Sequence, residues 1–224
     1  MIVQIYEVTT PAEARAISAM GVDHIGVLVG DGSFPREQTI EAAREIFTAI
    51  PAKSKASALS LSHDMDLVVR LTGALRPDIL HLGAAAPHFS PAELRTLKAE
   101  FPKVSLMRSI PVVDDSSIAL ARSYDGIADW LLLDSYESGD RQIGALGVTH
   151  NWELDRRIIE SVRIPVIIAG GLGPDNVKTA IRIARPAGVD SKTKTDKSDD
   201  SHTKDLQKVA AFVKEAHGLN CVTV

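Results

Sequence analysis

Cysteine is almost absent from this chain of 224 residues, which contains a single copy, Cys221, near its C-terminal end. One cysteine cannot form an intrachain disulfide or a cysteine cluster that binds a metal. Aromatic residues make up only 4%, and no apolar run approaches the roughly 18 residues that a membrane span needs. The first residues, MIVQIYEVTT, lack a basic segment followed by an apolar one, so we expect no signal peptide. We therefore expect a cytoplasmic protein with no membrane partner.

An excess of charge of one sign is also lacking. Lys and Arg number 25 against 29 Asp and Glu, which gives a net charge of −4 and a pI near 6.0. This balance offers no basic surface for nucleic acid. Neither H-x-H nor H-E-x-x-H spacing occurs, and the pair Asp114-Asp115 stands just before Ser116, where it suits the capping of a helix. We expect no metal site.

Apolar strands alternate with amphipathic helices along the whole chain. The predicted strands are residues 2–8, 24–30, 56–61, 79–83, 104–110, 130–134, 165–170 and 188–191. The predicted helices are residues 11–20, 35–50, 64–75, 91–100, 116–124, 152–162, 174–184 and 205–216. Eight such units predict a single domain over residues 1–224, an α/β fold of the (β/α)8 TIM barrel type, with its active site at the carboxyl ends of the strands. The rival, a doubly wound open sheet, normally has an early G-x-G-x-x-G, which this chain lacks.

The segment Ile164-Pro-Val-Ile-Ile-Ala-Gly-Gly is typical of a buried strand that enters a glycine turn and then a helix. Gly170 and Gly171 leave the backbone open to a ligand, and free N–H groups at a helix start favour an anion such as phosphate. In the predicted barrel this turn follows the seventh strand, where phosphate often binds together with the loop after the eighth. Ser191, Thr193 and Lys194, at the start of that loop, are predicted to complete the phosphate site.

Residues 192–204 contain no apolar side chain and alternate in charge. This composition is typical of a solvated, mobile loop after the eighth strand. Phosphate binding by its first residues is compatible with mobility of the remainder.

Four blocks of sequence resemble the phosphoribosylanthranilate isomerase family of tryptophan biosynthesis. They read Leu131-Leu-Leu-Asp-Ser, Gly144-Ala-Leu-Gly-Val-Thr-His-Asn-Trp, Ala169-Gly-Gly-Leu-Gly-Pro-Asp-Asn-Val and Arg185-Pro-Ala-Gly-Val-Asp. The resemblance implies a barrel of the ribulose-phosphate-binding type, with Asp134 as general acid and Arg36 facing an anthranilate carboxylate. It also implies that Gly147, in the glycine-rich block, contributes to phosphate binding. The implied reaction is an Amadori rearrangement of an aminoaldose phosphate to an aminoketose phosphate, without a cofactor.

The chain departs from this family where the family carries its general base. The family's Lys-Ile-Cys-Gly-Ile-Thr, whose cysteine is the base, is replaced by Gln4-Ile-Tyr-Glu-Val-Thr, so Tyr6 stands for the cysteine and Glu7 for the glycine. The family's Gln-Leu-His-Gly reads His81-Leu-Gly-Ala, and its Ser-Ser-Gly-Val-Glu reads Lys192-Thr-Lys-Thr-Asp. The resemblance therefore implies the fold and phosphate binding for this chain, but it does not imply the reaction, because the base is altered.

The residues themselves support particular roles in such a reaction. Asp134 ends an otherwise apolar strand, and burial at a barrel mouth raises a carboxyl pKa and lets it hold a proton. Tyr6 and Glu7 are candidate bases, although a free phenol has a pKa near 10 and strand alternation turns Glu7 toward the helices. His81 and Arg108, on the fourth and fifth predicted strands, are candidate substrate-binding residues. The alternatives are a structural histidine and a partly exposed ion pair.

The function that these observations favour is that of a phosphoribosylanthranilate isomerase-like enzyme acting on a small phosphosugar. Because the base is altered, a different sugar-phosphate isomerase or epimerase on the same barrel is the first alternative. A non-catalytic phosphometabolite-binding protein is the second. A homodimer is a candidate assembly.

Overall fold

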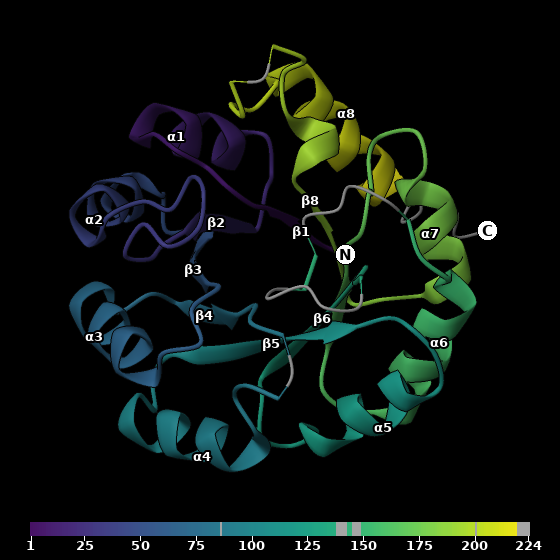
Figure 1. Cartoon of the computed structure of the whole chain (residues 1–224). Helices are drawn as coiled ribbons and strands as arrows, with labels where there is room; N and C mark the ends of the chain where they lie inside the picture. Colours follow the sequence, from purple (N-terminus) through teal and green to yellow (C-terminus); the bar gives the residue numbers. More distant parts are fainter. Residues whose placement is uncertain (86, 138–142, 145–148, 200, 219–224) are drawn as a thin grey trace.

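The computed structural model describes the chain apart from residues 86, 138–142, 145–148, 200 and 219–224. Within these ranges, eight parallel strands close into a barrel in chain order and eight helices surround it (Figure 1). The strands are β1 (Ile2–Ile5), β2 (His24–Leu28), β3 (Lys55–Ser60), β4 (Ile79–Leu82), β5 (Ser105–Pro111), β6 (Trp130–Asp134), β7 (Val166–Ile168) and β8 (Gly188–Ser191). The helices are α1 (Pro11–Ala19), α2 (Ile40–Ala49), α3 (Met65–Leu75), α4 (Pro91–Glu100), α5 (Ser116–Ser123), α6 (Trp152–Ser161), α7 (Val177–Ala184) and α8 (Leu206–His217), with a 3₁₀ turn η1 (Thr193–Thr195) after β8. The predicted TIM barrel is confirmed.

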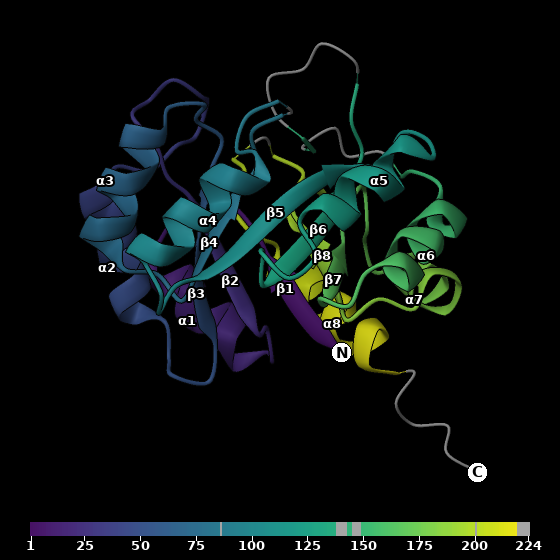
Figure 2. The same ribbon diagram turned by 90° about the horizontal axis from the view of Figure 1, so that it is seen from below.

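The barrel closes where β8 pairs with β1. Gln4 lies opposite Asp190 in this pairing, and Ile5 lies opposite Ser191. All strands run in the same direction, so their carboxyl ends meet on one face of the barrel. Figure 2 shows the barrel from the side, with the N-terminus at the end opposite the carboxyl ends of the strands. Residues that are far apart in the sequence, such as those ending β1, β6 and β8, are therefore neighbours on one face.

Side-chain alternation along the strands separates two buried layers. Side chains such as Val3, Ile5 and Leu133 point outward and pack with the helices in the large core. A smaller apolar cluster fills the barrel, and its members are Tyr6, Ile79, Met107, Leu132, Ile167 and Ala169. The interior is therefore packed below the carboxyl ends of the strands, as is usual for this fold.

The helices start at local capping signals. The side chain of Thr10 accepts the N–H of Glu13 at the start of α1, and Ser90 forms a reciprocal capping box with Glu93 at the start of α4. The helices are 8 to 12 residues long. In the part of the chain that the structure describes, no helix has the length and apolar character to cross a membrane.

Helix α2 begins later than the predicted start at residue 35. Gln38 pairs with Val29 in a parallel bridge, and its N–H donates to the carbonyl of Leu28 at 2.8 Å. Thr39 then caps α2, which starts at Ile40. Pro35 resembles a helix-start signal, but the chain there still belongs to the loop after β2. This correction places Arg36 in a loop at the carboxyl ends of the strands.

Strand β1 is also shorter than predicted, because it ends at Ile5. Glu7 has a φ of 57°, in the left-handed region. Side chains alternate between the two faces only while the backbone stays extended. The expectation that Glu7 faces the helices is therefore wrong, and Glu7 lines a cavity at the mouth of the barrel.

Candidate active site

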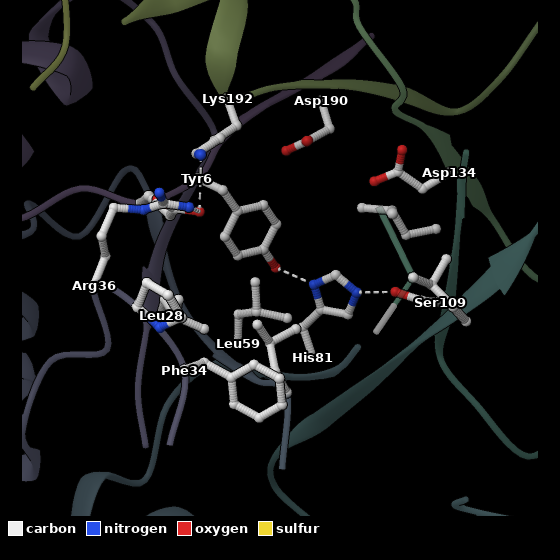
Figure 3. Close-up of a pocket in the computed structure, with 15 residues that line it drawn as sticks. Tyr6, Leu28, Phe34, Arg36, Leu59, His81, Ser109, Asp134, Asp190 and Lys192 are labelled. Atoms are coloured by element: carbon white, nitrogen blue, oxygen red, sulfur yellow. Dashed lines mark hydrogen bonds and ion pairs between the residues drawn. The ribbon is translucent and has the colours of Figure 1, made fainter. Parts of the chain in front are cut away.

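A cavity of about 260 Å³ opens at the carboxyl ends of the strands. One part of its wall is apolar and includes Leu28, Phe34, Leu59 and Leu61. The other part carries ionisable side chains, which are Tyr6, Glu7, Arg36, His81, Asp134, Asp190 and Lys192 (Figure 3). A wall of this kind can hold an aromatic ring on one side while charged groups orient the rest of a ligand.

A second cavity of about 30 Å³ adjoins the first, between the turn after β7 and the loop after β8. Of the six residues predicted for the phosphate site, the structure describes five, and all five line this cavity: Gly170, Gly171, Ser191, Thr193 and Lys194. Gly147 lies outside the described residues. Gly170 and Gly171 have φ values of 75° and 60°, which favour glycine and bring the backbone to the cavity. We call this second cavity, the site predicted for phosphate, the phosphate cup.

Not every polar group around the phosphate cup can contact a ligand. The hydroxyl of Ser191 donates to the carbonyl of Leu172 at 2.7 Å. The N–H of Gly173 donates to the side chain of Asn176 at 2.8 Å. The backbone of the Gly170-Gly171 turn and the side chain of Lys194 are therefore better placed than the Ser191 hydroxyl to hold an anion.

Asp134 ends β6 and lines both the cavity and the phosphate cup. It keeps some contact with the open cavity, but protein atoms enclose its carboxyl, and this burial raises its pKa to about 6. The backbone N–H of Ser135, which donates to Asp134 at 2.8 Å, partly offsets the rise. Gly144 leaves the space that the carboxyl occupies, since a Cβ atom at Gly144 would overlap it. Near neutral pH this carboxyl can exchange a proton with a substrate.

Asp190, near the end of β8, also lines both the cavity and the phosphate cup. It is 7% exposed, and the side-chain amide of Gln4 donates to its Oδ1 at 3.2 Å. Burial, followed by the charge on Asp134, raises its pKa to about 8. Asp190 is not among the site residues predicted from the sequence. The available signal was a carboxylate near the end of a predicted strand whose neighbours, Val189 and Gly188, are apolar or small.

Tyr6 and His81 belong to a hydrogen-bonded chain across the barrel. The Tyr6 hydroxyl lies 2.8 Å from Ser57 Oγ and 2.7 Å from His81 Nδ1, and His81 Nε2 lies 2.7 Å from Ser109 Oγ. Burial raises the pKa of the Tyr6 phenol well above its usual value. Burial and then the nearby Arg108 charge lower the pKa of His81 to about 3. Both side chains are therefore neutral near pH 7, and the phenolate that a base would require is strongly disfavoured.

Glu7, Arg36 and Lys192 form an ion cluster at the rim of the cavity, which we call the cation clamp. Arg36 Nε and Nη2 donate to the two oxygens of Glu7 at 2.6 and 3.3 Å, and Lys192 Nζ lies 3.2 Å from Glu7 Oε1. The cluster contains two cations and one anion, so it keeps one net positive charge beside the cavity. This arrangement brings the predicted Arg36 to the site. Lys192 also belongs to the site, although the sequence predicted it only as a residue of the loop after the eighth strand.

Arg108 does not face the cavity. Its guanidinium donates to the backbone carbonyls of Leu82, Ala84 and His88 at 2.7 to 3.0 Å, and the side chain is 1% exposed. It stabilises the segment after β4 from below the site. We find no contact between Arg108 and the described cavity wall that supports its predicted role in substrate binding.

The loop after β8 contains ordered contacts at both ends of residues 192–204. It begins with η1, and Asp196 pairs with Lys204 in an antiparallel bridge. The ammonium group of Lys204 is fully buried and bonds to the carboxylate of Asp196 and, at 3.2 Å, to the carbonyl of Lys192. These contacts anchor the two ends of the loop. The mobility of the remainder of residues 192–204 stays a prediction. In the described residues, no group of three His, Cys, Asp or Glu is placed to hold a metal ion.

Fold and site together define a (β/α)8 barrel in which a cavity lined by two aspartates and a glutamate adjoins a small cup with a glycine backbone. The family model for N-(5'-phosphoribosyl)anthranilate isomerase matches residues 3–215. The chain belongs to the phosphoribosylanthranilate isomerase family, and the resemblance drawn from its four sequence blocks is confirmed.

Individual relatives agree with this membership. The chain is 36% identical over 213 residues to N-(5'-phosphoribosyl)anthranilate isomerase of Methanocella arvoryzae, covering 95% of this chain and 96% of that protein. It is 34% identical over 215 residues to the enzyme of the same name from Haloferax volcanii, covering 96% and 92%. A solved phosphoribosyl anthranilate isomerase in complex with reduced 1-(o-carboxyphenylamino)-1-deoxyribulose 5-phosphate shares the fold, with a TM-score of 0.78 at 21% identity over 97% of this chain and 100% of that chain.

Proposed function

We propose that this protein isomerises phosphoribosylanthranilate, an aminoaldose phosphate, to the corresponding aminoketose phosphate in tryptophan biosynthesis. One observation carries the proposal. Asp134, a carboxyl with a pKa of about 6, lies at the junction between the phosphate cup and the larger cavity. A substrate with its phosphate in the cup and its aromatic group in the cavity places its sugar beside this carboxyl. Family membership supports the same reaction.

The two cavities match the two ends of the substrate. The phosphate is assigned to the Gly170-Gly171 turn and Lys194, and the anthranilate ring to the apolar wall that includes Leu28 and Leu59 (Figure 3). The net positive charge of the cation clamp, defined above, attracts the anthranilate carboxylate. These contacts hold the sugar in place for a reaction that needs no cofactor.

The Amadori rearrangement consists of proton transfers. A proton delivered to the ring oxygen allows the C1–O bond to break, which leaves a protonated imine at C1. Removal of a proton from C2 then gives an enolamine, and its conversion to the ketone completes the isomerisation. Each proton transfer by a positioned side chain contributes about 10²- to 10⁴-fold to the rate. Asp134 is proposed to take part in these transfers.

The direct test is turnover of phosphoribosylanthranilate by the purified protein, followed by the loss of its anthranilate fluorescence. Binding of the reduced product analogue is measured alongside. We expect turnover, and we expect Asp134→Asn to lose it almost completely while still binding the analogue. Asp114→Asn, an exposed carboxylate on the same face that lies outside the cavity wall, is the matched control. Full activity of Asp134→Asn would contradict the role of Asp134.

The pairing of Glu7 with Arg36 favours one alternative. The guanidinium of Arg36 already donates to the carboxylate of Glu7. The site therefore also suits a phosphosugar that has no aromatic carboxylate for Arg36 to bind. Tight binding of the analogue without turnover would favour a phosphometabolite-binding protein instead. Neither binding nor turnover would favour another sugar-phosphate isomerase or epimerase.

Two further expectations from the sequence stay predictions. Light scattering in solution tests the candidate homodimer. Cell fractionation tests the expected cytoplasmic location.

A further inference from the structure

The proposed reaction needs two proton-transfer groups, and position 6 carries Tyr6 rather than the cysteine base of the family pattern. Three ionisable side chains near that position are already engaged. The Tyr6 phenol is neutral and hydrogen-bonded to its neighbours, and both ring nitrogens of His81 are hydrogen-bonded. Both oxygens of Glu7 are held by cations. Among the acidic side chains that the structure describes in the cavity wall, this leaves Asp190 as the partner of Asp134.

Asp190 has the geometry that this role requires. It shares both the cavity wall and the phosphate cup with Asp134, and Figure 3 shows the two carboxyl groups pointing into the cavity from β8 and β6. Strand β7, which leads into the Gly170-Gly171 turn, lies between those two strands. The amide of Gln4 orients the Asp190 carboxyl at 3.2 Å. A sugar that extends from the phosphate cup therefore meets a carboxyl on each side.

We infer that Asp190 and Asp134 form a proton-sharing pair that performs both proton transfers of the isomerisation. The inference rests on the proposed function. The protonated member of the pair gives its proton to the ring oxygen as the C1–O bond breaks. The ionised member takes the proton from C2, whose bonding electrons form the C1–C2 double bond while the electrons of the C–N double bond move to nitrogen. The pair thus ends with one proton, as it began.

The charges around Asp190 favour one proton on the pair at neutral pH. Burial and then the negative charges of Asp134 and Glu7 raise the pKa of Asp190, Gln4 and Lys204 lower it, and together they place it at about 8. Burying two neighbouring carboxylates without a shared proton is costly, so one of them stays protonated. The titration belongs to the pair rather than to either residue alone.

The surroundings of Asp134 keep it the more acidic member. Burial and the charge of Asp155 raise its pKa, the hydrogen bonds from Ser135 and the charge of His150 lower it, and together they place it at about 6. Between about pH 6 and pH 8 the pair therefore carries one proton and one negative charge.

The test compares wild type, Asp190→Asn, Asp134→Asn and the control Asp114→Asn in kcat/KM for phosphoribosylanthranilate between pH 5 and 9. We expect a bell-shaped profile for wild type and Asp114→Asn, with limbs near pH 6 and pH 8. Asp190→Asn is expected to lose about 10²- to 10⁴-fold in kcat, to lose one limb, and to bind the reduced product analogue as wild type does. A variant that only disturbs packing would weaken analogue binding and keep both limbs.

A second measurement separates failure of the pair from failure of the proposed function. Carbon-13 NMR of the aspartate carboxyl groups in the free protein is expected to show coupled titration, with the pKa of Asp190 falling in Asp134→Asn. If wild type does not turn over phosphoribosylanthranilate while this coupling is present, the proposed function fails and the proton-sharing pair stands. If wild type is active and Asp190→Asn keeps its kcat and both limbs, the inference is overturned. Independent titration of the two carboxyls overturns it as well.

Discussion

Glu7 accepts two N–H bonds from Arg36, at 2.6 and 3.3 Å, although both residues have left-handed backbone, with φ values of 57° and 68°. Such a conformation costs a residue other than glycine of the order of 1–3 kcal/mol, and it persists where surrounding contacts hold it. The ion pair supplies contacts of this kind at both residues. The pair places an internal carboxylate against the arginine that the family resemblance assigns to the substrate carboxylate.

Removal of the Glu7 charge is expected to strengthen substrate binding. In Glu7→Gln, Arg36 and Lys192 would face the anthranilate carboxylate without a competing anion, so KM for phosphoribosylanthranilate should fall several-fold. Arg36→Ala should raise KM about tenfold or more, because a hydrogen bond to a charged group contributes roughly 1.5–3 kcal/mol. Steady-state kinetics at low salt measure both effects. A product analogue without the carboxylate is the control, and equal gains for both ligands in Glu7→Gln would contradict the explanation.

The sequence predicted the barrel because its signals are local and repeated. Each strand is a short apolar run, and several helices carry a start signal such as that of Ser90 and Glu93. The phosphate turn at Gly170 was predictable for the same reason, since strand, glycines and helix follow one another in the chain. Asp134 was predictable as a lone carboxylate at the end of an apolar strand.

The remainder of the site depends on contacts between distant segments. The position of Glu7 follows from one left-handed residue, which a strand pattern does not reveal. Asp190 gains its proton affinity from burial and from Asp134, 56 positions away in the sequence, so its own neighbours give little signal. Arg108 looked like a ligand-binding residue, but its two terminal nitrogens donate to carbonyls at and after the end of β4. Patterns in the chain identify elements, whereas charge partners across the barrel require the fold.

The need for glycine at position 170 can be tested by comparison with Gly32, which also has a positive φ but has open space around the position of a Cβ atom. A Cβ atom at Gly170 would lie 2.5 Å from His150 Nδ1, whereas a Cβ atom at Gly32 would meet nothing within 4 Å. Both have positive φ, 75° and 90°. Gly32→Ala should therefore cost about 1–2 kcal/mol from strain alone, and Gly170→Ala should cost more and raise KM. Urea unfolding and kinetics measure this, and equal effects of the two variants would contradict the close contact between position 170 and His150.

Catalysis should not depend on a thiol. Cys221 is the single cysteine of the chain, and neither proposed proton-transfer group is a cysteine. Cys221→Ser, and wild type treated with iodoacetamide, should keep the kcat of untreated wild type. Loss of kcat in both, with folding unchanged by circular dichroism, would require a thiol in the reaction.

Asp190 should reduce the stability of the protein at high pH. Its folded pKa is about 8, well above the value of about 3.9 in an unfolded chain, so the folded state binds the extra proton. That stabilising proton is present at low pH and is lost as pH rises from about 4 through 8. Asp190→Asn should therefore be more stable than wild type at pH 8, by about 2 kcal/mol or more, and the difference should shrink toward pH 5. Urea unfolding at several pH values measures it, and a constant difference would contradict a raised pKa.

Lys204 and Asp196 should contribute to stability only as a pair. The side chains of Lys204 and Asp196 are 0% and 7% exposed, and burial lowers the pKa of Lys204 while the neighbouring carboxylate raises it. Removal of one partner leaves a buried charge without compensation, which costs about 3–5 kcal/mol, whereas replacement of both by apolar residues of similar size is often neutral. Lys204→Met should therefore be strongly destabilising, and Lys204→Met combined with Asp196→Leu should recover most of the loss.

Lys197 provides the matched control for this pair, because it is exposed in the same loop. Lys197→Met should change the free energy of unfolding by no more than about 0.5 kcal/mol. Hydrogen exchange over residues 192–204 then tests the predicted mobility of the loop separately from its anchoring. Fast exchange between the anchored ends in wild type, spreading to the Lys204 amide in Lys204→Met, is the expected pattern. If Lys204→Met matches Lys197→Met in stability, the buried ion pair does not anchor the loop that forms one wall of the phosphate cup.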